Sequence, residues 1–414
     1  MKRRAFIRNA ALAAAAIAAP AVRAAKARIV IVGGGFGGSA CALFLKHAAP
    51  SLDVTLIDRD ARYVTCPMSN EVVVGARSIE SLTVTRDGLR RAGVRFVRAR
   101  AKALDVDARS IRLEDGARLA YDRCVVAPGV RFLWGTPEGY DEAACETMPH
   151  AWEAGAQTTR LAQWVQGIDD GGVFAISVPS GLMRCPPGPY ERASLVAEYF
   201  ARHKPRSKVL IFDANNRFPR QEAFTSAWDT LYRGRIEWIP VTEGGAVERV
   251  DPRTNTLHTS SGAHHVALAN VIPPQAPGGF ALDSELASGH GWCPVDPSTF
   301  ASTLVPHVHV IGDACIADAM PKAASAALSQ ARRCAAAIVA SLAGRELPVP
   351  ALDSVCYSAV ALDRALAIRL RFRLVNGRIE PEPTAGDAST MPSAAEREGA
   401  GEWYRSIRAE AFGV

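Results

Sequence analysis

A glycine-rich turn near the start of the chain constrains the fold more than any other feature. Residues 27–60, ARIVIVGGGFGGSACALFLKHAAPSLDVTLIDRD, read as an apolar strand, the turn, an apolar-faced helix and a second strand that ends in acid. Gly33, Gly35 and Gly38 form G-x-G-x-x-G, which permits a tight turn and a close approach of the backbone to a pyrophosphate. Asp58 lies twenty residues after Gly38, where a ribose-binding carboxylate belongs. The pattern predicts a βαβ dinucleotide site.

Two later segments favour FAD over NAD as the dinucleotide. CVVAPGV (Cys124–Val130) is a strand that ends in a Pro-Gly turn, similar to the second nucleotide-contact segment of flavoproteins with two dinucleotide-binding domains. HVIGDACI (His309–Ile316) is similar to their late Gly-Asp motif, whose aspartate binds the ribityl chain of FAD. By resemblance, Gly312 and Asp313 take that role here. A helix N-cap is the alternative for Asp313 alone.

A second α/β unit follows without a fingerprint of its own. Gly172–Val178 and Lys208–Phe212 read as buried strands, and Ala267–Ile272 as another. After the first of these the chain reads VPSGLMRCPPGPYERAS, which offers no glycine turn of the fingerprint type. We therefore expect this domain to keep its fold without binding a nicotinamide dinucleotide.

The first 24 residues read as an export signal of the twin-arginine type. MKRRAFIR is basic, the apolar run AALAAAAIAA is too short to span a bilayer, and small residues near Ala24 suit a signal peptidase. Removing the five basic residues of this leader lowers the formal net charge from +6 to +1, so a nucleic-acid partner loses its electrostatic support. We expect a periplasmic protein that is exported folded with its cofactor inserted.

The nine cysteines are an odd number, so at least one is free or attached to something else. Cys66, in the loop RYVTCPMSNEV, has no second cysteine at the spacing of a thioredoxin-like pair. Cys185 lies beside two prolines in RCPPGPYERAS, and Cys356 lies in DSVCYSA near the C-terminus. The other cysteines are expected to be small buried thiols (Cys41, Cys124 and Cys334) or receive no role (Cys145, Cys293 and Cys315).

Seven segments together resemble the flavoprotein subunit of flavocytochrome c sulfide dehydrogenase. They are YVTCPMSNEVVVG, YDRCVVAPG, MPHAWEAG, RCPPGPYERAS, GWCPVD, HVIGDACIADAMPK and VCYS. The resemblance runs from the fingerprint to the C-terminal WYRSI, but AASAALSQARR after Lys322 is richer in Ala than the family leads us to expect, and residues 378–398 resemble nothing that we can place. It implies an α/β fold of the glutathione-reductase-like class, with two dinucleotide-binding domains and a C-terminal interface module.

The 414 residues exceed what one hydrophobic core usually holds, so several domains are expected. Val308–Asp313 reads as the last buried strand, a helix follows Pro321, and Pro381–Gly401 reads as an irregular connection. The expected boundaries are 1–24 for the signal peptide, 25–150 and 285–345 for the two parts of the FAD domain, 151–284 for the second Rossmann-like domain and 346–414 for the C-terminal module.

The resemblance also implies a chemistry. FAD is expected to be attached to Cys66 by a thioether through a ring methyl, and a redox-active disulfide to join Cys185 and Cys356. Hydrosulfide then attacks one sulfur of the disulfide, and the released thiolate passes two electrons to the flavin. This chain carries no Cys-x-x-Cys-His haem motif, so the expected acceptor is a c-type cytochrome subunit that holds haem c.

Two charged residues are candidates for supporting that chemistry. Glu191 is the candidate for proton transfer, and a solvated carboxylate stabilised by the helix dipole is the alternative. Lys322, with the helix N-terminus, is expected to stabilise reduced flavin, and a plain surface lysine is the alternative. No metal ligands are assigned. The expected cofactor-binding residues are Gly33, Gly35, Phe36, Gly37, Gly38, Asp58, Arg59, Cys66, Ser69, Asn70, Ala127, Pro128, Gly129, Gly312, Asp313 and Lys322.

Three other functions compete with sulfide dehydrogenation. The main one is a flavoprotein of the same fold that reactivates the sulfur-carrier protein of the periplasmic thiosulfate-oxidising system, which would share Cys66 and the disulfide. A membrane quinone reductase for sulfide needs an amphipathic or apolar C-terminal anchor, whereas this tail is mixed and polar. A non-enzymatic subunit stabilised by FAD predicts that replacing Cys185 or Cys356 leaves function intact.

Overall fold

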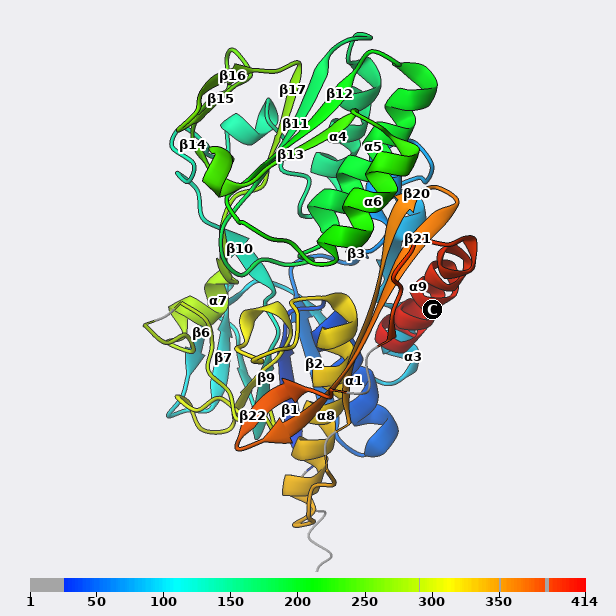
Figure 1. Cartoon of the computed structure of the whole chain (residues 1–414). Helices are drawn as coiled ribbons and strands as arrows, with labels where there is room; N and C mark the ends of the chain where they lie inside the picture. The colour runs from blue at the N-terminus through cyan, green and yellow to red at the C-terminus, as the bar shows by residue number, and fades with distance from the viewer. Residues whose placement is uncertain (1–25, 290, 350, 384–386) are drawn as a thin grey trace, which may run out of the picture.

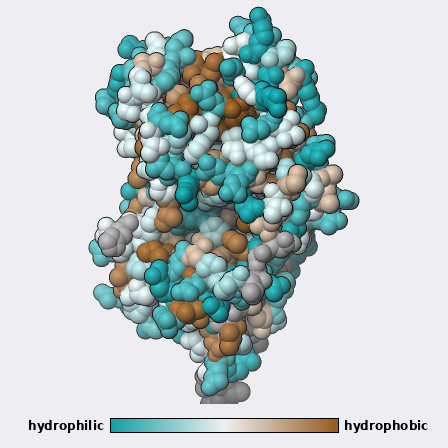
Figure 2. Space-filling model, in the orientation of Figure 1, coloured by the Kyte–Doolittle hydropathy of each residue, from teal (hydrophilic) through white to brown (hydrophobic). Residues whose placement is uncertain are grey.

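Two α/β units and a C-terminal module build the molecule (Figure 1). The computed structural model describes residues 26–289, 291–349, 351–383 and 387–414, so the expected signal peptide lies outside the described residues. Within these ranges no helix combines the length and the apolarity that a bilayer crossing requires. On the face drawn in Figure 2, hydrophobic residues are scattered among hydrophilic ones rather than gathered into one band.

The first unit is a five-stranded parallel sheet in the order β19-β9-β1-β2-β5. Its central strands are almost continuously apolar because both faces of the sheet are buried. Helix α1 follows β1 and helix α8 packs against α1. The bounds are β1 Arg28–Val32, α1 Phe36–Ala48, β2 Asp53–Asp58, β5 Arg95–Arg98, β9 Arg123–Val126, β19 Val308–Val310 and α8 Ala324–Leu342. The expected βαβ unit is thereby confirmed, whereas the last strand ends three residues earlier than expected, because Gly312 at φ +76° begins a 3₁₀ turn.

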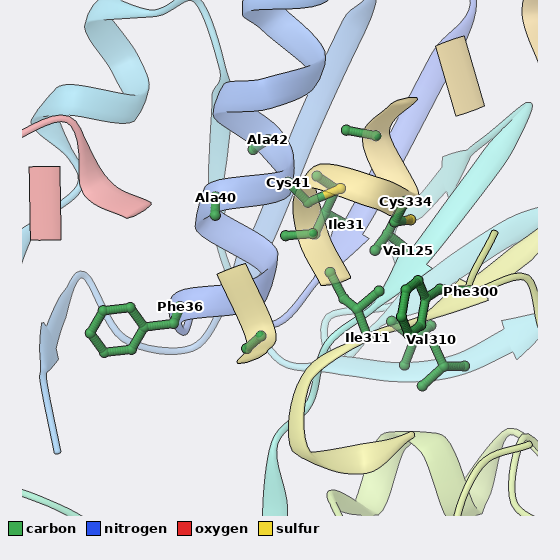
Figure 3. Close-up of a cluster of buried hydrophobic side chains, with 14 of the residues drawn as sticks. Ile31, Phe36, Ala40, Cys41, Ala42, Val125, Phe300, Val310, Ile311 and Cys334 are labelled. Carbon is green, nitrogen blue, oxygen red and sulfur yellow. The ribbon is translucent and has the colours of Figure 1, made fainter. Parts of the chain in front are cut away.

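The core of this unit lies where α1 and α8 meet the sheet (Figure 3). Cys41 on α1 and Cys334 on α8 are fully buried and lie beside Ile31 and Val125 of the strands. Burial raises the pKa of the Cys334 thiol well above its usual value. These cysteines, like Cys124 at 0% exposure, are core thiols as the sequence predicts.

The second unit has a four-stranded parallel sheet in the order β13-β12-β11-β17, flanked by α4, α5 and α6. Asp213 ends β12, the position at which a Rossmann unit presents its ribose carboxylate. Here its Oδ2 accepts hydrogen bonds from the Tyr190 hydroxyl at 2.6 Å and the Trp238 indole at 2.8 Å, so the carboxylate serves the protein interior. The bounds are α4 Ala156–Gly167, β11 Val173–Val178, α5 Gly188–His203, β12 Lys208–Asp213, α6 Gln221–Leu231, β13 Ile236–Ile239 and β17 Leu268–Val271.

Smaller elements complete both units. A three-stranded antiparallel sheet (β6-β7-β8) is inserted into the first unit and another (β14-β15-β16) into the second, while β10 pairs with β18 at the junction of the units. The bounds are β3 Arg62–Val64, α2 Ser69–Val73, β4 Thr83–Thr85, α3 Asp87–Arg91, β6 Ala101–Asp105, β7 Ser110–Leu113, β8 Arg118–Ala120, β10 Val130–Phe132, β14 Val247–Asp251, β15 Thr256–Thr259, β16 Gly262–His265, β18 Gln275–Pro277 and α7 Gly279–Asp283.

The C-terminal module reaches across both units. The long hairpin of β20 and β21, orange in Figure 1, contacts α8 of the first unit and α5 of the second, and α9 packs on it and on α1. The bounds are β20 Leu352–Ala361, β21 Arg364–Val375, β22 Arg378–Pro381, β23 Asp387–Ala388 and α9 Ala394–Phe412. The expected irregular connection over Pro381–Gly401 is wrong for its second part. Helix α9 begins there because the Ser393 side chain accepts a hydrogen bond from the Glu396 N–H and caps it.

The end of α9 packs closely on α3, and this contact gives a test of the fold. A Cβ added at Gly88 would lie 2.0 Å from the carbonyl oxygen of Phe412, a backbone atom that cannot rotate away. We expect Gly88→Ala to lower the free energy of unfolding by about 1–3 kcal/mol, measured by denaturant unfolding of the full-length protein. Gly167→Ala is the control, because no atom lies within 4 Å of its added Cβ. Equal unfolding midpoints for the two variants would contradict this packing.

Candidate functional site

One cavity of about 1140 Å³ lies between the units and under the C-terminal module. Its walls come from segments far apart in the sequence, among them the glycine turn, the loop after β3, the β11–α5 connection, β20 and α9. Every candidate site residue predicted from the sequence lines this cavity, with two exceptions, Gly38 and Lys322.

The backbone of the glycine turn can approach a ligand closely because it carries no side chains. The neighbouring atoms also leave no room for a Cβ at two of its glycines. Gly33 has φ +100°, and a Cβ there would lie 2.2 Å from the Ala127 carbonyl oxygen. A Cβ on Gly38 would lie 1.9 Å from the Gly33 carbonyl oxygen. Gly38 therefore lets the helix pack against the turn and does not line the cavity, which corrects its assignment as a contact residue.

The backbone of the glycine turn fixes the Asp58 carboxylate at the cavity wall. Its Oδ2 accepts a hydrogen bond from the Gly34 N–H, and its Oδ1 accepts one from the Asp60 N–H at 2.8 Å. The fully buried Arg86 lies 3.5 Å from Oδ2 and also donates to the Gly34 carbonyl. Sequence reasoning missed Arg86, because it follows a short strand in a segment with no recognisable motif.

Asp313 lines the cavity and Lys322 does not. The Lys322 ammonium donates to the backbone oxygens of Asp313 at 2.6 Å and Cys315 at 3.1 Å, and it lies 3.6 Å from the centre of the Trp292 ring. The side chain turns away because these partners stabilise a half-buried ammonium better than an open wall does. Lys322 therefore does not line the cavity beside which it is expected from the sequence. Lys322 instead lines a separate cavity of about 280 Å³.

Cys66 follows β3 in a loop that turns directly into α2. Its carbonyl oxygen accepts the Ser69 N–H at 3.0 Å, and Met68 adopts the left-handed conformation at φ +69°. Ser69 and Asn70, the first residues of α2, are buried and also line the cavity. The loop therefore holds the Cys66 sulfur at the wall without needing a second cysteine.

Cys185 and Cys356 line the same cavity although the sequence places them in different modules. The Cys185 N–H donates to the Lys322 carbonyl at 2.8 Å, and the residue has φ +54°, a strained conformation for a non-glycine residue. Its sulfur lies over Gly188, where an added Cβ would be 3.0 Å from Sγ. Burial raises the pKa of both thiols, and the Glu191 charge raises each of them further. Cys185 is exposed at the cavity wall, whereas Cys356 is partly buried.

Glu191 is in the first turn of α5 and lines the cavity close to both cysteines. Its Oε1 accepts a hydrogen bond from Asn70 Nδ2 at 3.1 Å. Burial, together with the charge of Glu71, raises the pKa of Glu191 to about 7, although the Asn70 bond opposes the shift. A carboxyl group that is half-protonated near neutral pH is suited to proton transfer.

The buried Arg192 is the main residue that sequence reasoning missed. It donates to His150 and Ala151 carbonyl oxygens at 3.1 and 2.7 Å and lies over the Trp152 ring. Burial and the Arg192 charge lower the pKa of His150 to about 3, so that imidazole is neutral. Arg192 follows Glu191 directly, yet a buried arginine with no carboxylate partner leaves no signal in a sequence.

The residues present fit an FAD molecule. The cavity is large enough for a dinucleotide, the glycine turn at one end has free space for a pyrophosphate, and the Asp313 carboxylate is on its wall. Among the described residues no side chain or backbone group donates a hydrogen bond to that carboxylate, which leaves both its oxygens for ribityl hydroxyls. The tether candidate Cys66 and the pair Cys185 and Cys356 lie on the walls of the same space.

Three family models match the chain. Residues 27–159 match "Pyridine nucleotide-disulphide oxidoreductase", residues 158–273 match "Sulfide dehydrogenase [flavocytochrome c] flavoprotein chain, central", and residues 348–412 match "Flavocytochrome c sulphide dehydrogenase, flavin-binding". The last match covers the module that closes the cavity.

Individual relatives agree with these matches. The chain is 51% identical over 45 residues to the sulfide dehydrogenase [flavocytochrome c] flavoprotein chain of Chlorobaculum thiosulfatiphilum, which is 94% of that sequence and 11% of this chain. It is 22% identical over 302 residues to the mitochondrial sulfide:quinone oxidoreductase of Mus musculus, and 30% identical over 128 residues to the sulfide-quinone reductase of Aquifex aeolicus. These matches cover 69% and 30% of this chain, and 65% and 30% of the respective relatives.

The solved structure of the Aquifex aeolicus sulfide:quinone oxidoreductase superposes with a TM-score of 0.76 at 16% identity, covering 94% of this chain and 93% of that one. Putidaredoxin reductase, in its covalent complex with putidaredoxin, gives a TM-score of 0.64 at 16% identity and 93% coverage of both chains. These likenesses confirm the fold with two dinucleotide-binding domains. With two family models and the Chlorobaculum relative in agreement, the chain belongs to the family of flavocytochrome c sulfide dehydrogenase flavoprotein chains.

Proposed function

We propose that this chain is the flavoprotein subunit of a periplasmic sulfide dehydrogenase, which oxidises sulfide to sulfane sulfur and passes electrons singly to a c-type cytochrome. One observation carries the proposal. A single cavity brings Cys185 and Cys356 together with Glu191, Cys66 and the glycine turn, although these groups come from four separate parts of the chain. Two cysteines, a carboxyl group that titrates near pH 7 and a flavin site are the set that two-electron oxidation of hydrosulfide requires.

The two cysteines account for the sulfur chemistry. In the oxidised protein they form a disulfide, and hydrosulfide attacks one of its sulfur atoms. That attack leaves a persulfide on one cysteine and a thiolate on the other. Over a full cycle one hydrosulfide ion yields one sulfane sulfur atom, one proton and two electrons. The proline-stiffened, strained backbone at Cys185 holds its sulfur at the cavity wall throughout.

Glu191 handles the proton that each cycle releases. Its carboxyl group is close enough to both thiols for its charge to raise their pKa values. With its own pKa at about 7, it accepts a proton at neutral pH and returns it to solvent without a large energetic cost. At low pH the protonated carboxyl can no longer accept a proton, so we expect sulfide oxidation to decline as pH falls below about 7.

The bound FAD supplies the step from a two-electron donor to a one-electron acceptor. The chain's own contribution is to position it through the glycine turn, Asp313 and a thioether at Cys66. A covalent tether keeps the cofactor in place through export, which agrees with the twin-arginine signal expected from the sequence.

The shape of α9 favours a cytochrome over a membrane quinone as the acceptor. The buried residues of α9 face inward and pack against the rest of the protein. They are Ala400, Tyr404, Ile407, Ala411 and Phe412. Its outward positions carry Glu402, Arg405 and Ser406, so α9 keeps no apolar stripe with which to enter a bilayer. A soluble haem protein does not require such a stripe.

The central experiment measures haem reduction. We expect the full-length flavin-loaded protein, with any co-purified subunit, to reduce oxidised cytochrome c when sulfide is added. Cys185→Ser and Cys356→Ser should each lower that rate at least about 10³-fold, because either change removes the disulfide. Cys145→Ser is the matched control, since Cys145 is buried outside the cavity. Absence of haem reduction, with reduction of a soluble quinone analogue instead, would contradict the proposed acceptor.

The tether is tested separately from turnover. After acid denaturation we expect yellow flavin to stay with the proteolytic peptide that contains Cys66, and mass spectrometry to find the FAD mass on that cysteine. Cys66→Ala should release all flavin on denaturation, whereas Cys145→Ser should retain it. Free flavin from the unaltered protein would rule out the thioether and leave the sulfide chemistry to be judged on the cysteine variants.

A further inference from the structure

We propose that Glu71 and Arg397, a charge pair formed by a buried carboxylate and a partly buried guanidinium from opposite ends of the chain, are positioning residues that set the protonation of Glu191 by acting on it in opposite directions. The inference rests on the proposed function, in which Glu191 transfers the proton. Neither residue has an expected role from the sequence.

The pair is well defined in the structure. Glu71, in α2, is 3% exposed, and its Oε1 lies 2.7 Å from Nη2 of Arg397 in α9. Its other oxygen, Oε2, accepts a hydrogen bond from Arg77 Nε at 2.8 Å. The approach of Arg397 to Oε1 is close but poorly aligned, so this oxygen makes no regular hydrogen bond. Both Glu71 and Arg397 line the cavity, whereas Arg77 does not.

Helix α2 connects the pair to Glu191. Asn70, the neighbour of Glu71, donates through Nδ2 to Glu191 Oε1 at 3.1 Å and to the Gly188 carbonyl at 3.2 Å. Asn70 Oδ1 in turn accepts a hydrogen bond from Arg192 Nε at 3.0 Å. Because the amide is held on both sides, the Glu191 carboxyl and the Glu71 carboxylate keep a fixed separation along α2 and α5.

The charges around Glu191 come from every element packed on it. Burial raises its pKa most, Glu71 on α2 raises it further, and Arg397 on α9 and Arg192 on its own helix lower it. The groups ahead of α5 and on β20 are the Cys185 and Cys356 thiols, whose raised pKa values keep them protonated. Glu71 and Arg397 therefore shift the pKa of Glu191 in opposite directions, and either charge without the other would move that pKa away from neutral pH.

Arg397 also links this balance to the C-terminal module. Its Nε donates to the Leu362 carbonyl at 2.9 Å, in the turn between β20 and β21. Its backbone N–H donates to the Ser393 carbonyl at 3.2 Å in the first turn of α9. The guanidinium itself is held between the Leu362 carbonyl and the Glu71 carboxylate, so its charge has a fixed place relative to Glu191.

Four variants of the full-length flavin-loaded protein test the inference. The measurement is the pH titration of the Glu191 carboxyl by infrared difference spectroscopy, with the band assigned by its loss in Glu191→Gln. We expect Glu71→Gln to lower the titration midpoint and Arg397→Gln to raise it, each by roughly one pH unit. The double variant should return close to the unaltered protein, and Arg397→Lys should stay near it because the charge is kept.

Arg77→Gln is the control for structural damage, since it removes an arginine from the same carboxylate but from outside the cavity. It should move the midpoint far less than Arg397→Gln does. Midpoints that stay in place, or that move in the same direction in Glu71→Gln and Arg397→Gln, overturn the inference while sulfide oxidation in the unaltered protein still supports the function. If Glu191→Gln removes no titrating band and oxidises sulfide normally, both the inference and the role of Glu191 fail.

Discussion

The Arg192 guanidinium is the interaction on which the cavity walls depend. It is 1% exposed and donates to the carbonyl oxygens of His150 and Ala151 and to the side-chain oxygens of Asn70 and Asn270. These acceptors belong to α2, β17 and the segment that enters the second unit, so one cation joins the loop after Cys66 to the second sheet. Desolvating a buried charge costs several kcal/mol, and the four acceptors offset that cost together. Each of these oxygens left without its donor would cost about 1–3 kcal/mol of stability. We therefore expect the loss of Arg192 to disturb all of these wall segments together.

The same cavity walls shape the chemistry of the cysteine pair. Thiolates at Cys185 and Cys356 are disfavoured by burial and by the charge of Glu191. At neutral pH the reduced pair is therefore held as two thiols. In the proposed cycle, the thiolate released by each attack is poorly stabilised and strongly nucleophilic, which favours its onward reaction. Burial also raises the pKa of Glu191 to about 7, so that part of this carboxyl is ionised at neutral pH and can accept a proton.

What the sequence could predict follows from how local each signal is. The glycine turn and Asp58 lie within one βαβ unit, and their spacing is fixed by one helix, so the spacing alone indicates the site. The start of α9 had a local signal as well, because Ser393 and Glu396 have the spacing of a capping box, but the surrounding Pro, Ala and Gly outweighed it. Lys322 was misplaced because its position along the chain is beside the cavity, while its amine finds partners on the other side.

The charge pairs are a different case, because nothing in the sequence relates their members. Glu71 and Arg397 meet only after the C-terminal module has folded back over the first unit. Arg86 likewise reaches Asp58 across a turn that no periodicity predicts. Resemblance to a family could bring Cys185 and Cys356 together, since both lie in recognisable segments. The electrostatics around them had to come from the fold.

The second unit indicates how the proposed sulfide oxidation can proceed without a nicotinamide. In a dinucleotide domain the connection from the first strand to its helix is the glycine turn that holds the pyrophosphate. Here the connection from β11 to α5 carries Cys185 and two prolines, and α5 begins with Glu191 in its first turn. One short connection cannot both open for a phosphate and hold the Cys185 sulfur rigidly at the cavity wall. Asp213, the remaining ribose-type carboxylate, is bonded to Tyr190 of the same α5 and so supports the new arrangement. Under the proposed function, the residues that stand in place of a second fingerprint are thus the residues that supply the reactive sulfur, so a nicotinamide site and this sulfur site exclude each other in the same connection.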